Sequence, residues 1–564
     1  MSKNIDCFFI GHNEMKFSEY ENKIRKMGIN SGAYRDLNLN FVQYKENIYT
    51  AAEVFNKFYS DINKNDETFK EFTLGDTFSL TIAYLGTYLN KRGLSIDYVN
   101  SFQNEKETLA KKLTNNKILS IVIPTTLYVS MFPIIEIVSF VRQYNKTAKI
   151  IIGGPFIATQ MKTQEDSIIQ YLFNTINADF YINNSQGEET LYKLIHALRN
   201  DVSYKDIDNI SYRNGDKYIS NPWKAENNSL AENIVDWTNF EDKIDESIAV
   251  RTSISCPFSC SFCGFPQHAG KYQLTSIDAI EKELNCIDSL GKVKSINFID
   301  DTFNVPPERF KELLRLMIKN KYKFKWNSHY RCQFADRETV ELMKESGCEG
   351  VFLGIESGSE QILKNMNKAA TIENYKKGIA LLKEYDIITH ASFIIGFPGE
   401  TEETVQETIN FIEETQPIFF RTQLWYCDPF TPIWNQREQY GIKGSQFEWK
   451  HKTMDAHIAC DLIEEIFLSV KNSTWLPQNN FEFEGVFQLL RRGMSLEQIK
   501  TFVEGFNQGV KDKLIDNKNQ ELSFMAIEKI KESFYKDNKL YDLKSNIGIK
   551  DYVDDFDMEA SFEF

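Results

Sequence analysis

Short apolar runs alternate with segments of helical periodicity through residues 1–205 of the chain. The apolar runs predict buried strands at residues 6–11, 94–99, 118–123, 149–155 and 178–182. The periodic segments between them predict helices at residues 75–91, 134–144 and 188–198. Strands that alternate with helices favour a parallel sheet covered on both faces, so we expect an α/β, Rossmann-like domain.

A second alternation of strands and helices begins at residue 248. Strands and the loops that follow them are predicted at residues 248–255, 295–303, 325–331, 350–358, 391–400 and 421–427. Apolar stripes predict helices between them, as at residues 310–318 and 401–414. Six such units predict a partial (β/α)6 barrel of the TIM type, with its chemistry at the carboxyl ends of the strands.

These patterns divide the chain into four regions. We expect a Rossmann-like domain at residues 1–205 with an insertion at 13–72, a linker at 206–245, the barrel at 246–440, and a mainly helical region with an acidic tail at 441–564. Ser495 and Gln498 fit a capping box, which predicts that a helix of the last region begins there.

Composition narrows the classes of function. The 564 residues carry a formal net charge of −15, which argues against a nucleic-acid partner. No run of about 18 apolar residues predicts a membrane span. The first residues lack the apolar core of a signal peptide. We therefore expect a cytoplasmic protein without a membrane or nucleic-acid partner.

The most informative motif is a group of three cysteines, Cys256, Cys260 and Cys263, with the spacing C-x3-C-x2-C. It offers three thiolates to a 4Fe–4S cluster and leaves the fourth iron open. Two alternatives are a structural zinc site and three unrelated buried thiols. Zinc prefers four ligands, usually as two separated pairs, and no second Cys-x-x-Cys pair is present. The other cysteines are scattered, so a disulfide framework is not expected.

With this motif after its first barrel strand, the chain resembles the radical SAM superfamily. The resemblance implies that S-adenosylmethionine (SAM) binds the open iron and is cleaved to a 5′-deoxyadenosyl radical. It also implies a set of SAM-binding residues at the strand ends: Phe262 beside adenine, Asp301 (with Asp300 and Thr302) at the amino group, Arg331 at the carboxylate, Glu356 and Ser357 at ribose and carboxylate, and Gly396 and Pro398 in the adenine loop. Each of them has an alternative as a solvated loop group or a helix cap.

Two further candidates end the sixth barrel strand, Tyr426 and Cys427. A thiol facing the reaction cavity could act as a redox group or hydrogen donor, so we include both residues among the catalytic candidates. The alternative for Cys427 is a small buried hydrophobic residue.

Small residues follow three strands of the first domain, where parallel sheets bind ligands. They are Thr125 and Thr126, then Gly153, Gly154 and Pro155, then Gly187 and Glu188. Ordinary turns are the alternative for each loop alone. Taken together, residues 60–205 resemble the cobalamin-binding domain of class B radical SAM enzymes. No Asp-x-His-x-x-Gly loop is present, so we expect cobalamin held base-off, with His12 as a minor alternative ligand and His196 as a packed or surface residue.

The class B resemblance implies a methyltransferase. One SAM methylates Co(I) cobalamin, a second SAM gives the radical that takes hydrogen from the substrate, and the substrate radical takes the methyl group. Residues 5–15 and 30–39 resemble the radical SAM P-methyltransferases of phosphinothricin-type biosynthesis, which implies a phosphinate phosphorus as acceptor; relatives with carbon acceptors share such openings. The sequence shows no basic cluster that would mark a phosphinate site.

The substrate expected from this resemblance is a small molecule or peptide, free or carrier-linked, and the electron donor is a flavodoxin or ferredoxin. Alternatives remain: a cobalamin-dependent radical SAM rearrangement, cyclisation or oxidation without methyl transfer, and, remotely, a cobalamin-binding sensor. A methylthiotransferase is disfavoured, because only Cys7 precedes Cys256.

Overall fold

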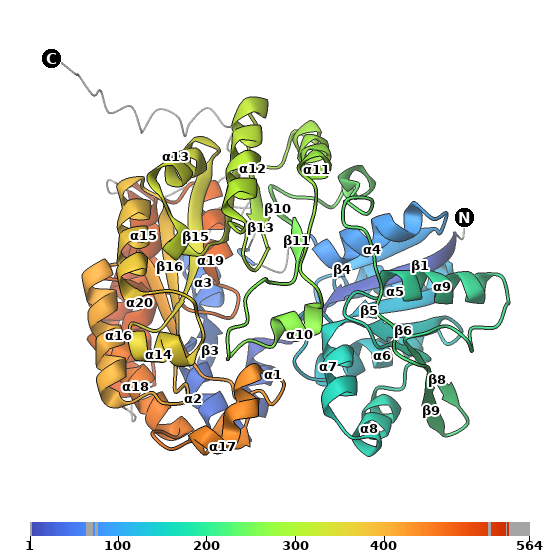
Figure 1. Ribbon diagram of the computed structural model, residues 1–564, viewed down its shortest axis with the longest axis horizontal. Coiled ribbons are helices and arrows are strands. Elements are labelled where there is room, and N and C mark those ends of the chain that lie inside the picture. Colours follow the sequence, from blue (N-terminus) through green and yellow to red (C-terminus); the bar gives the residue numbers. More distant parts are fainter. Residues whose placement is uncertain (1–2, 64–70, 74–76, 517–519, 537–538, 541–564) are drawn as a thin grey trace.

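The computed structural model describes residues 3–63, 71–73, 77–516, 520–536 and 539–540. Two seven-stranded sheets form its two halves (Figure 1). The acidic tail expected at the end of the chain lies outside the described residues. Along the described chain, no helix combines the length and apolar character that crossing a membrane requires.

The first sheet has the strand order β4-β1-β5-β6-β7-β8-β9. Its parallel strands are β1 (Asn4–His12), β4 (Ile96–Ser101), β5 (Lys117–Pro124), β6 (Lys149–Gly153) and β7 (Phe180–Ile182). Its helices are α4 (Leu80–Asn90), α5 (Lys106–Asn115), α6 (Phe132–Tyr144), α7 (Pro155–Thr163), α8 (Asp166–Ile176) and α9 (Glu188–Arg199). The predicted Rossmann-like alternation is confirmed. The pattern missed α5, α7, α8 and the antiparallel edge hairpin β8 (Ile210–Asn214) and β9 (Lys217–Ser220).

Strand β1 shows why helices cover both faces of this sheet. Phe9 is buried in the same apolar cluster as residues of α4 and α9, whereas Phe8 and Ile10 are buried in another cluster with residues of α5, α6 and α8. Because successive side chains of a strand point to opposite faces, the continuous apolar run Cys7–Ile10 is buried on both sides.

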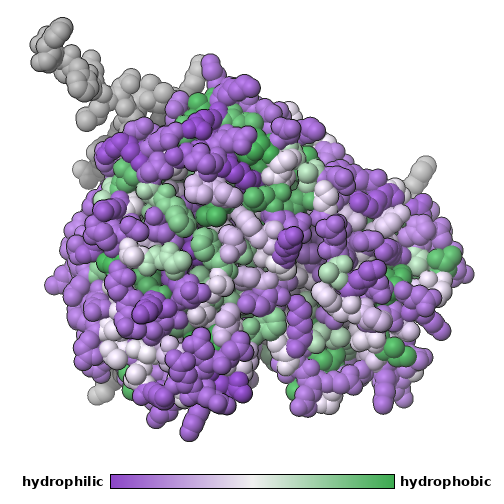
Figure 2. All heavy atoms as spheres, in the orientation of Figure 1, coloured by the Kyte–Doolittle hydropathy of each residue, from purple (hydrophilic) through white to green (hydrophobic). Residues whose placement is uncertain are grey.

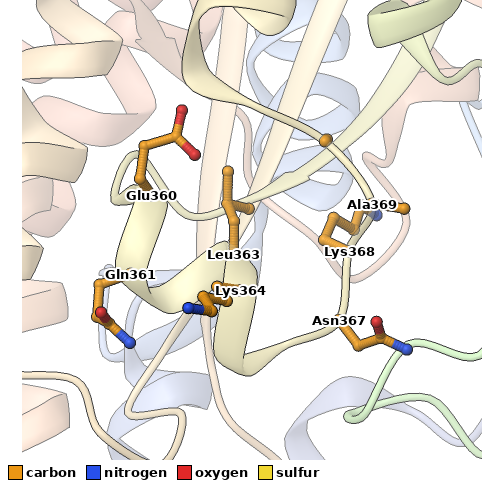
Figure 3. A pocket seen from close by; sticks show the side chains of 8 residues that line it. Glu360, Gln361, Leu363, Lys364, Asn367, Lys368 and Ala369 are labelled. Atoms are coloured by element: carbon orange, nitrogen blue, oxygen red, sulfur yellow. The ribbon is translucent and has the colours of Figure 1, made fainter.

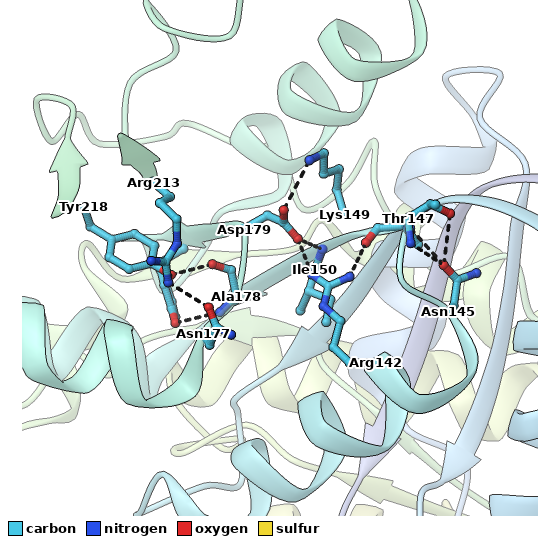
Figure 4. A network of polar contacts seen from close by, with 12 residues as sticks. Arg142, Asn145, Thr147, Lys149, Ile150, Asn177, Ala178, Asp179, Arg213 and Tyr218 are labelled. Carbon is cyan, nitrogen blue, oxygen red and sulfur yellow. Dashed lines mark hydrogen bonds and ion pairs between the residues drawn. The ribbon is translucent and has the colours of Figure 1, made fainter. Parts of the chain in front are cut away.

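Polar contacts fasten the sheet at the amino end of β6 (Figure 4). Asp179 accepts hydrogen bonds from Arg142 at 2.5 Å and from the backbone N–H of Ile150 at 2.8 Å. Lys149 forms a further ion pair with Asp179. This network lies at the opposite end of β6 from the loop that contains Gly153 and Gly154, so we assign it to stability.

The insertion forms α1 (Phe17–Arg25), α2 (Gly32–Asn38), β2 (Phe41–Tyr44), β3 (Asn47–Thr50) and α3 (Ala51–Ile62). It packs on the barrel and the C-terminal helices, where its elements lie in Figure 1. Arg421 of the barrel donates to Asn40 at 2.9 Å, and Lys513 donates to the carbonyl oxygen of Phe41 at 2.8 Å. The insertion, which lies near the start of the chain, therefore packs against both the barrel and the C-terminal helix α20.

The second sheet is the partial barrel, with the order β10-β13-β14-β15-β16-β17-β20 and every pair parallel. Its strands are β10 (Ser247–Val250), β13 (Ser295–Phe298), β14 (Lys325–His329), β15 (Cys348–Glu356), β16 (Ile388–Ile395), β17 (Phe419–Leu424) and β20 (Thr474–Trp475). All six predicted strands are confirmed. The seventh strand, β20, was not predicted because it contains only two residues.

Helices surround this sheet on its outer side (Figure 1). They are α11 (Ile277–Ser289), α12 (Pro307–Asn320), α13 (Arg337–Glu345), α15 (Ile372–Glu384), α16 (Glu402–Thr415) and α18 (Ala456–Ser469). Shorter elements complete the barrel: β11 (Ser253–Ile254), α10 (Phe265–Ala269), β12 (Gln273–Leu274), α14 (Glu360–Asn365), α17 (Arg437–Tyr440), β18 (Lys443–Ser445) and β19 (Glu448–Lys450).

The C-terminal region contains α19 (Phe483–Arg491), α20 (Leu496–Ile515) and α21 (Phe524–Glu532). The predicted capping box of α20 is confirmed, since the side chains of Ser495 and Gln498 each bond to the other's backbone N–H. Figure 2 shows a largely hydrophilic face, with a notch between the two halves of the molecule.

Candidate functional site

The three motif cysteines lie on the loop between β11 and α10. Cys260 is buried, Cys256 and Cys263 are half-buried, and none forms a disulfide. The backbone N–H of Phe265 donates to Cys263 Sγ at 3.4 Å. Burial raises the pKa of Cys263 to about 11, and the nearby Cys260 and Cys256 add to that rise. Three free sulfurs in mutual electrostatic range, one with a backbone donor, fit a 4Fe–4S cluster.

The zinc alternative gains no support. Within the described ranges, no group of three His, Cys, Asp or Glu side chains has the geometry to hold a single metal ion. Cluster cysteines bind different irons, so their sulfurs need not converge on one point.

Arg331 lies directly against the cysteine loop. Its Nη2 is 3.4 Å from Cys260 Sγ, and its guanidinium carbon is 3.5 Å from the centroid of the Phe258 ring. The backbone N–H and C=O of Arg331 are both bonded to the side chain of Asn304 at 3.0 Å. Strand β14 and Asn304 therefore hold the guanidinium of Arg331 beside the sulfurs.

Glu356 forms a buried ion pair with Lys368. The Nζ–Oε1 distance is 2.7 Å, and the Lys368 ammonium also lies 5.6 Å from the centroid of the Phe262 ring. A register shift after Gly354 and a φ of +69° at Glu356 direct the carboxylate here. Sequence reasoning missed Lys368, because it follows α14 in a loop without a recognisable motif.

The residues predicted at the ends of β13 and β15 have different surroundings. Asp300 is buried and accepts hydrogen bonds from the backbone and hydroxyl groups of Thr252 and Ser253, so it ties β13 to the segment before the cysteines. Asp301 is exposed. Ser357 is fully buried, and its Oγ accepts the backbone N–H of Ser359 at 3.1 Å.

The loop after β16 is tightly fixed. Gly396 has a φ of +93°, and a Cβ there would lie 2.4 Å from the Trp449 ring. Its N–H donates to buried Glu400, whose pKa burial raises to about 8. The carbonyl oxygen of Pro398 accepts from Asn365 at 3.2 Å. Phe397, between them, makes an edge contact with Phe262 at 6.5 Å, so the loop reaches the cysteine motif.

The two candidates after β17 have contacts of their own. Tyr426 is half-exposed and packs on Phe447 at 5.1 Å between ring centroids. Cys427 is fully buried, and its backbone exchanges two hydrogen bonds with Gln446. Burial raises the pKa of Cys427 to about 12. These contacts favour the packing alternative for Cys427.

The predicted loops of the first sheet contact one another. Thr125 is buried, and both its N–H and its Oγ1 donate to the carbonyl oxygen of Gly153. Gly154 has a φ of +110°, and a Cβ there would lie 3.0 Å from Thr125 Oγ1. Pro155 begins α7, while Thr126 is exposed and its hydroxyl lies 3.3 Å from that of Thr81.

The loop between β7 and α9 contains Gly187, which is in close contact with a neighbouring side chain, and the buried acid Glu188. A Cβ at Gly187 would lie 2.7 Å from a methyl group of Ile182. Glu188 is buried, and its carboxylate accepts a hydrogen bond from Asn228 at 2.8 Å. Burial raises the pKa of Glu188 to about 7, and the nearby Arg251 partly opposes that rise. Glu188 therefore has partners within the protein.

The two histidines of the first domain, His12 and His196, have different surroundings. His12 stacks on Tyr128 with ring centroids 5.2 Å apart, whereas His196 is exposed on α9.

The two halves meet beside the cysteines, a contact that sequence reasoning missed. Nδ1 of His268, on α10, is 3.3 Å from Thr159 Oγ1 of α7, and Ser185 Oγ donates to the carbonyl oxygen of His268 at 2.5 Å. Lys162 donates to the carbonyl oxygen of Gln267 at 3.2 Å. The segment that follows the third cysteine thus contacts the loops at the carboxyl edge of the first sheet, and α10 lies next to α7 in Figure 1.

A pocket of about 480 Å³ lies at α14 and the loop that follows it (Figure 3). It is lined by α14 and the residues after it: Glu360, Gln361, Leu363, Lys364, Asn367, Lys368, Ala369 and Ala370. Asn367 donates to the carbonyl oxygen of Ser259 at 2.9 Å. One residue of the pocket lining therefore contacts the cysteine loop.

Comparison with known families places this geometry in context. Residues 250–412 match the model of the radical SAM superfamily. Residues 250–412 form a radical SAM domain. The predicted superfamily is thereby confirmed, and the radical SAM domain contains all three motif cysteines together with Arg331 and Glu356.

Two curated relatives extend beyond this domain. The chain is 24% identical over 339 residues to an uncharacterized methyltransferase of Pyrococcus horikoshii, covering 58% of this chain and 71% of the relative. It is 26% identical over 383 residues to the anaerobic magnesium-protoporphyrin IX monomethyl ester cyclase of Cereibacter sphaeroides, covering 64% of this chain and 60% of the cyclase.

The fold is also that of a solved structure. The radical S-adenosylmethionine methyltransferase TsrM from Kitasatospora setae, solved with cobalamin and a [4Fe-4S] cluster bound, aligns with a TM-score of 0.52 at 17% identity. The alignment covers 65% of this chain and 76% of TsrM. At this identity the likeness shows a common fold, in which a radical SAM domain follows an α/β domain.

Proposed function

We propose that the chain is a cobalamin-dependent radical SAM methyltransferase that moves a methyl group from SAM through cobalamin to an unactivated carbon or a phosphinate phosphorus. The radical SAM domain, the methyltransferase of Pyrococcus horikoshii and the fold of TsrM with its cobalamin and cluster support this function.

The observation that carries the proposal is the pair of buried cations at the motif. Arg331 is 3.4 Å from Cys260, and Lys368 is paired with Glu356 beside Phe262. Cys256, Cys260 and Cys263 would hold the cluster. When bound there, the cluster would supply the electron for the cleavage of SAM, and cobalamin would carry the methyl group.

The chain's own residues then bind SAM. A guanidinium fork suits a carboxylate, so Arg331 is assigned to the SAM carboxylate. The ion pair of Glu356 with Lys368 offers an acceptor for ribose hydroxyls and a second cation. The aromatic edge of Phe262 and the fixed loop at Gly396 and Pro398 are assigned to adenine, and exposed Asp301 to the amino group. Ser357 and Cys427 are assigned to packing, because both are fully buried.

Cobalamin is assigned to the carboxyl edge of the first sheet. Glycine leaves the backbone accessible to a ligand, and small hydroxyl side chains can bond to a ligand's polar groups. The residues assigned to cobalamin are Thr125, Thr126, Gly153, Gly154, Pro155 and Gly187. Glu188 is assigned a structural role, because its buried carboxylate lies near the charge of Arg251. Because His12 stacks on Tyr128, we propose that cobalamin is held base-off, without a histidine ligand.

The partners follow from this chemistry. The proposed substrate is a small molecule or a peptide, free or carrier-linked. The proposed electron donor is a flavodoxin or ferredoxin, and the oxygen-sensitive cluster favours the cytoplasm.

The test is an anaerobic assay of reconstituted protein with SAM, a reductant and cobalamin. The proposal predicts 5′-deoxyadenosine formation and label transfer from methyl-labelled SAM to the product. Arg331→Lys, which keeps the charge but loses the planar fork, should lower the yield of 5′-deoxyadenosine at limiting SAM more than at saturating SAM.

The cyclase relative favours a second candidate, a rearrangement or cyclisation without methyl transfer. The same assay separates the two functions. A product without the methyl label, formed together with 5′-deoxyadenosine, would favour the cyclase type.

A further inference from the structure

Two of the three motif sulfurs have hydrogen-bond donors of different charge. Cys263 Sγ accepts from a neutral group, the backbone N–H of Phe265, at 3.4 Å. Cys260 Sγ accepts from a charged group, Nη2 of Arg331, also at 3.4 Å. Hydrogen bonds from a charged donor are roughly twice as strong as those between neutral groups. Cys260 therefore differs from Cys263 in its electrostatic surroundings, although the motif alone does not distinguish the two thiols.

The guanidinium of Arg331 is fixed by three contacts. Besides the contact of Nη2 with Cys260, Nη1 donates to the carbonyl oxygen of Lys368 at 3.4 Å. The centroid of the Phe258 ring lies 3.5 Å from the guanidinium carbon, a stacked geometry that suits arginine. Arg331 is 8% exposed. Its orientation toward the sulfur is therefore set by groups of the protein and not by water.

Arg331 has no carboxylate partner within the part of the chain that the structure describes. Glu356, the buried acid of the site, is paired with Lys368 at 2.7 Å instead. A buried charge without a counter-ion is costly. The sulfur of Cys260, which becomes a thiolate when it binds iron, is thus the anionic group that this guanidinium contacts.

The backbone of Arg331 is held by Asn304, in the loop after β13. Asn304 Oδ1 accepts the N–H of Arg331 and its Nδ2 donates to the carbonyl oxygen of Arg331, both at 3.0 Å. Asn304 is 2% exposed. Arg331 lies just beyond the end of β14, so these two bonds fix a backbone segment that no longer belongs to the strand.

We propose that Arg331 has a second role besides binding the SAM carboxylate: its hydrogen bond to Cys260 raises the reduction potential of the cluster, and Asn304 is the positioning residue for this bond. The inference rests on the cluster of the proposed function and adds to it the residues that set its potential.

The physical reason is the charge that reduction adds. One electron from the proposed flavodoxin or ferredoxin enters the cluster, no bond forms or breaks, and no proton moves. The added negative charge spreads over the irons and their sulfurs. A cation held 3.4 Å from one sulfur, in a buried site, therefore stabilises the reduced state more than the oxidised state.

The test is a redox titration of anaerobically reconstituted full-length protein without SAM, in which EPR measures the reduced cluster. Arg331→Met removes the charge and the donor but keeps an unbranched side chain, so its midpoint potential should fall. At the midpoint potential of the unmodified protein, the ratio of reduced to oxidised cluster should fall about tenfold, which corresponds to about 59 mV for one electron.

Lys162→Met is the matched control. Lys162 is exposed and donates to the carbonyl oxygen of Gln267, on the helix α10 that follows Cys263. The variant therefore removes the same charge near the motif without removing a donor to a sulfur. Salt screens exposed charges, so its midpoint potential should equal that of the unmodified protein.

Asn304→Ala tests the positioning role. It should lower the midpoint potential in the same direction as Arg331→Met. The double variant should have the potential of Arg331→Met alone, because Asn304 acts through the guanidinium. Additive falls in the double variant would overturn the assignment of Asn304.

Two results would overturn the role of Arg331: an unchanged midpoint potential in Arg331→Met, or an equal fall in Lys162→Met. If Arg331→Met does not bind a cluster, Arg331→Gln, which is neutral but keeps a side-chain amide, carries the test with the same criteria. A cluster with the same potential in all variants would refute this inference alone. Unmodified protein that binds no cluster would refute the proposed function.

Discussion

At the scale of single residues, the site depends on charges that are buried beside the cysteines. Arg331 and Lys368 would be costly in isolation, and each is compensated by a specific neighbour: the Cys260 sulfur and Phe258 ring for the first, and Glu356 for the second. A cluster held by three thiolates and the carboxylate of SAM would place negative charge at this point, so the cations favour both of these groups.

The buried pair gives a first prediction. Glu356→Gln leaves the Lys368 ammonium buried without its counter-ion, so we expect a loss of about 3–5 kcal/mol in the free energy of unfolding, measured in urea. The matched control is Glu414→Gln, which removes the partner of Lys376 in an exposed pair and should cost at most about 1 kcal/mol. Equal losses in the two variants would contradict the proposed strength of the buried pair.

Glu400 gives a prediction about pH. Its pKa is raised from 4.5 to about 8 by burial, so the folded state binds more protons than the unfolded state between these values. The contribution of Glu400 to stability is therefore full below pH 4.5 and is lost as the pH rises through about 8.

Glu400→Gln cannot ionise and keeps an acceptor for the Gly396 N–H. Its Tm relative to the unmodified protein should rise steadily between pH 5 and pH 8, and the corresponding difference in the free energy of unfolding should rise by about 1.4 kcal/mol per pH unit at most. A Tm difference that does not vary with pH would show that the carboxyl titrates normally.

At the scale of elements, two loops at the carboxyl edge of the first sheet are fixed by contact with each other. Gly154 has a φ of +110°, and a Cβ there would lie 3.0 Å from Thr125 Oγ1. Gly154→Val should strain this loop and lower the amount of cobalamin that remains bound after gel filtration, measured by absorbance.

The control for that variant is Gly215→Val, since Gly215 also has a positive φ but lies in the β8–β9 turn with open space around it. It should lose stability without losing cobalamin. If both variants retained cobalamin equally, the assignment of the cofactor to the β5 and β6 loops would be wrong.

Elements also show what sequence can and cannot predict. The strands of both sheets were predictable, because runs such as Ile150–Ile152 have no polar position and must be buried on both faces. The β8–β9 hairpin and β20 were not, because short edge strands carry little periodicity. Gly154, Gly187 and Gly396 could be identified from the sequence because each follows a predicted strand. The structure shows, in addition, which neighbouring residue leaves no room for a side chain at each position.

At the scale of the whole molecule, the unpredicted features are those that join distant segments. The cysteine motif and Arg331 could be found from spacing and strand ends. The ion pair of Lys368 with Glu356 and the contact of His268 with Thr159 could not, since each brings together groups from separate elements. The insertion before α4 was recognised as an insertion, but its packing on the barrel and on α20 is a property of the fold.

Helix α10, which follows the cysteine motif, forms the contact between the barrel and the first domain. The loop that holds the cysteines continues into a segment bonded to Thr159 and Ser185, at the carboxyl edge of the first sheet. These contacts connect the proposed cluster site to the proposed cobalamin site.

The most direct test of the account is the iron–sulfur absorbance of anaerobically reconstituted protein, together with its formation of 5′-deoxyadenosine from SAM. We predict that both are present, and that both disappear when Cys256, Cys260 and Cys263 are replaced by alanine. Absorbance that is missing from the unmodified protein, or unchanged in the triple variant, would contradict the account.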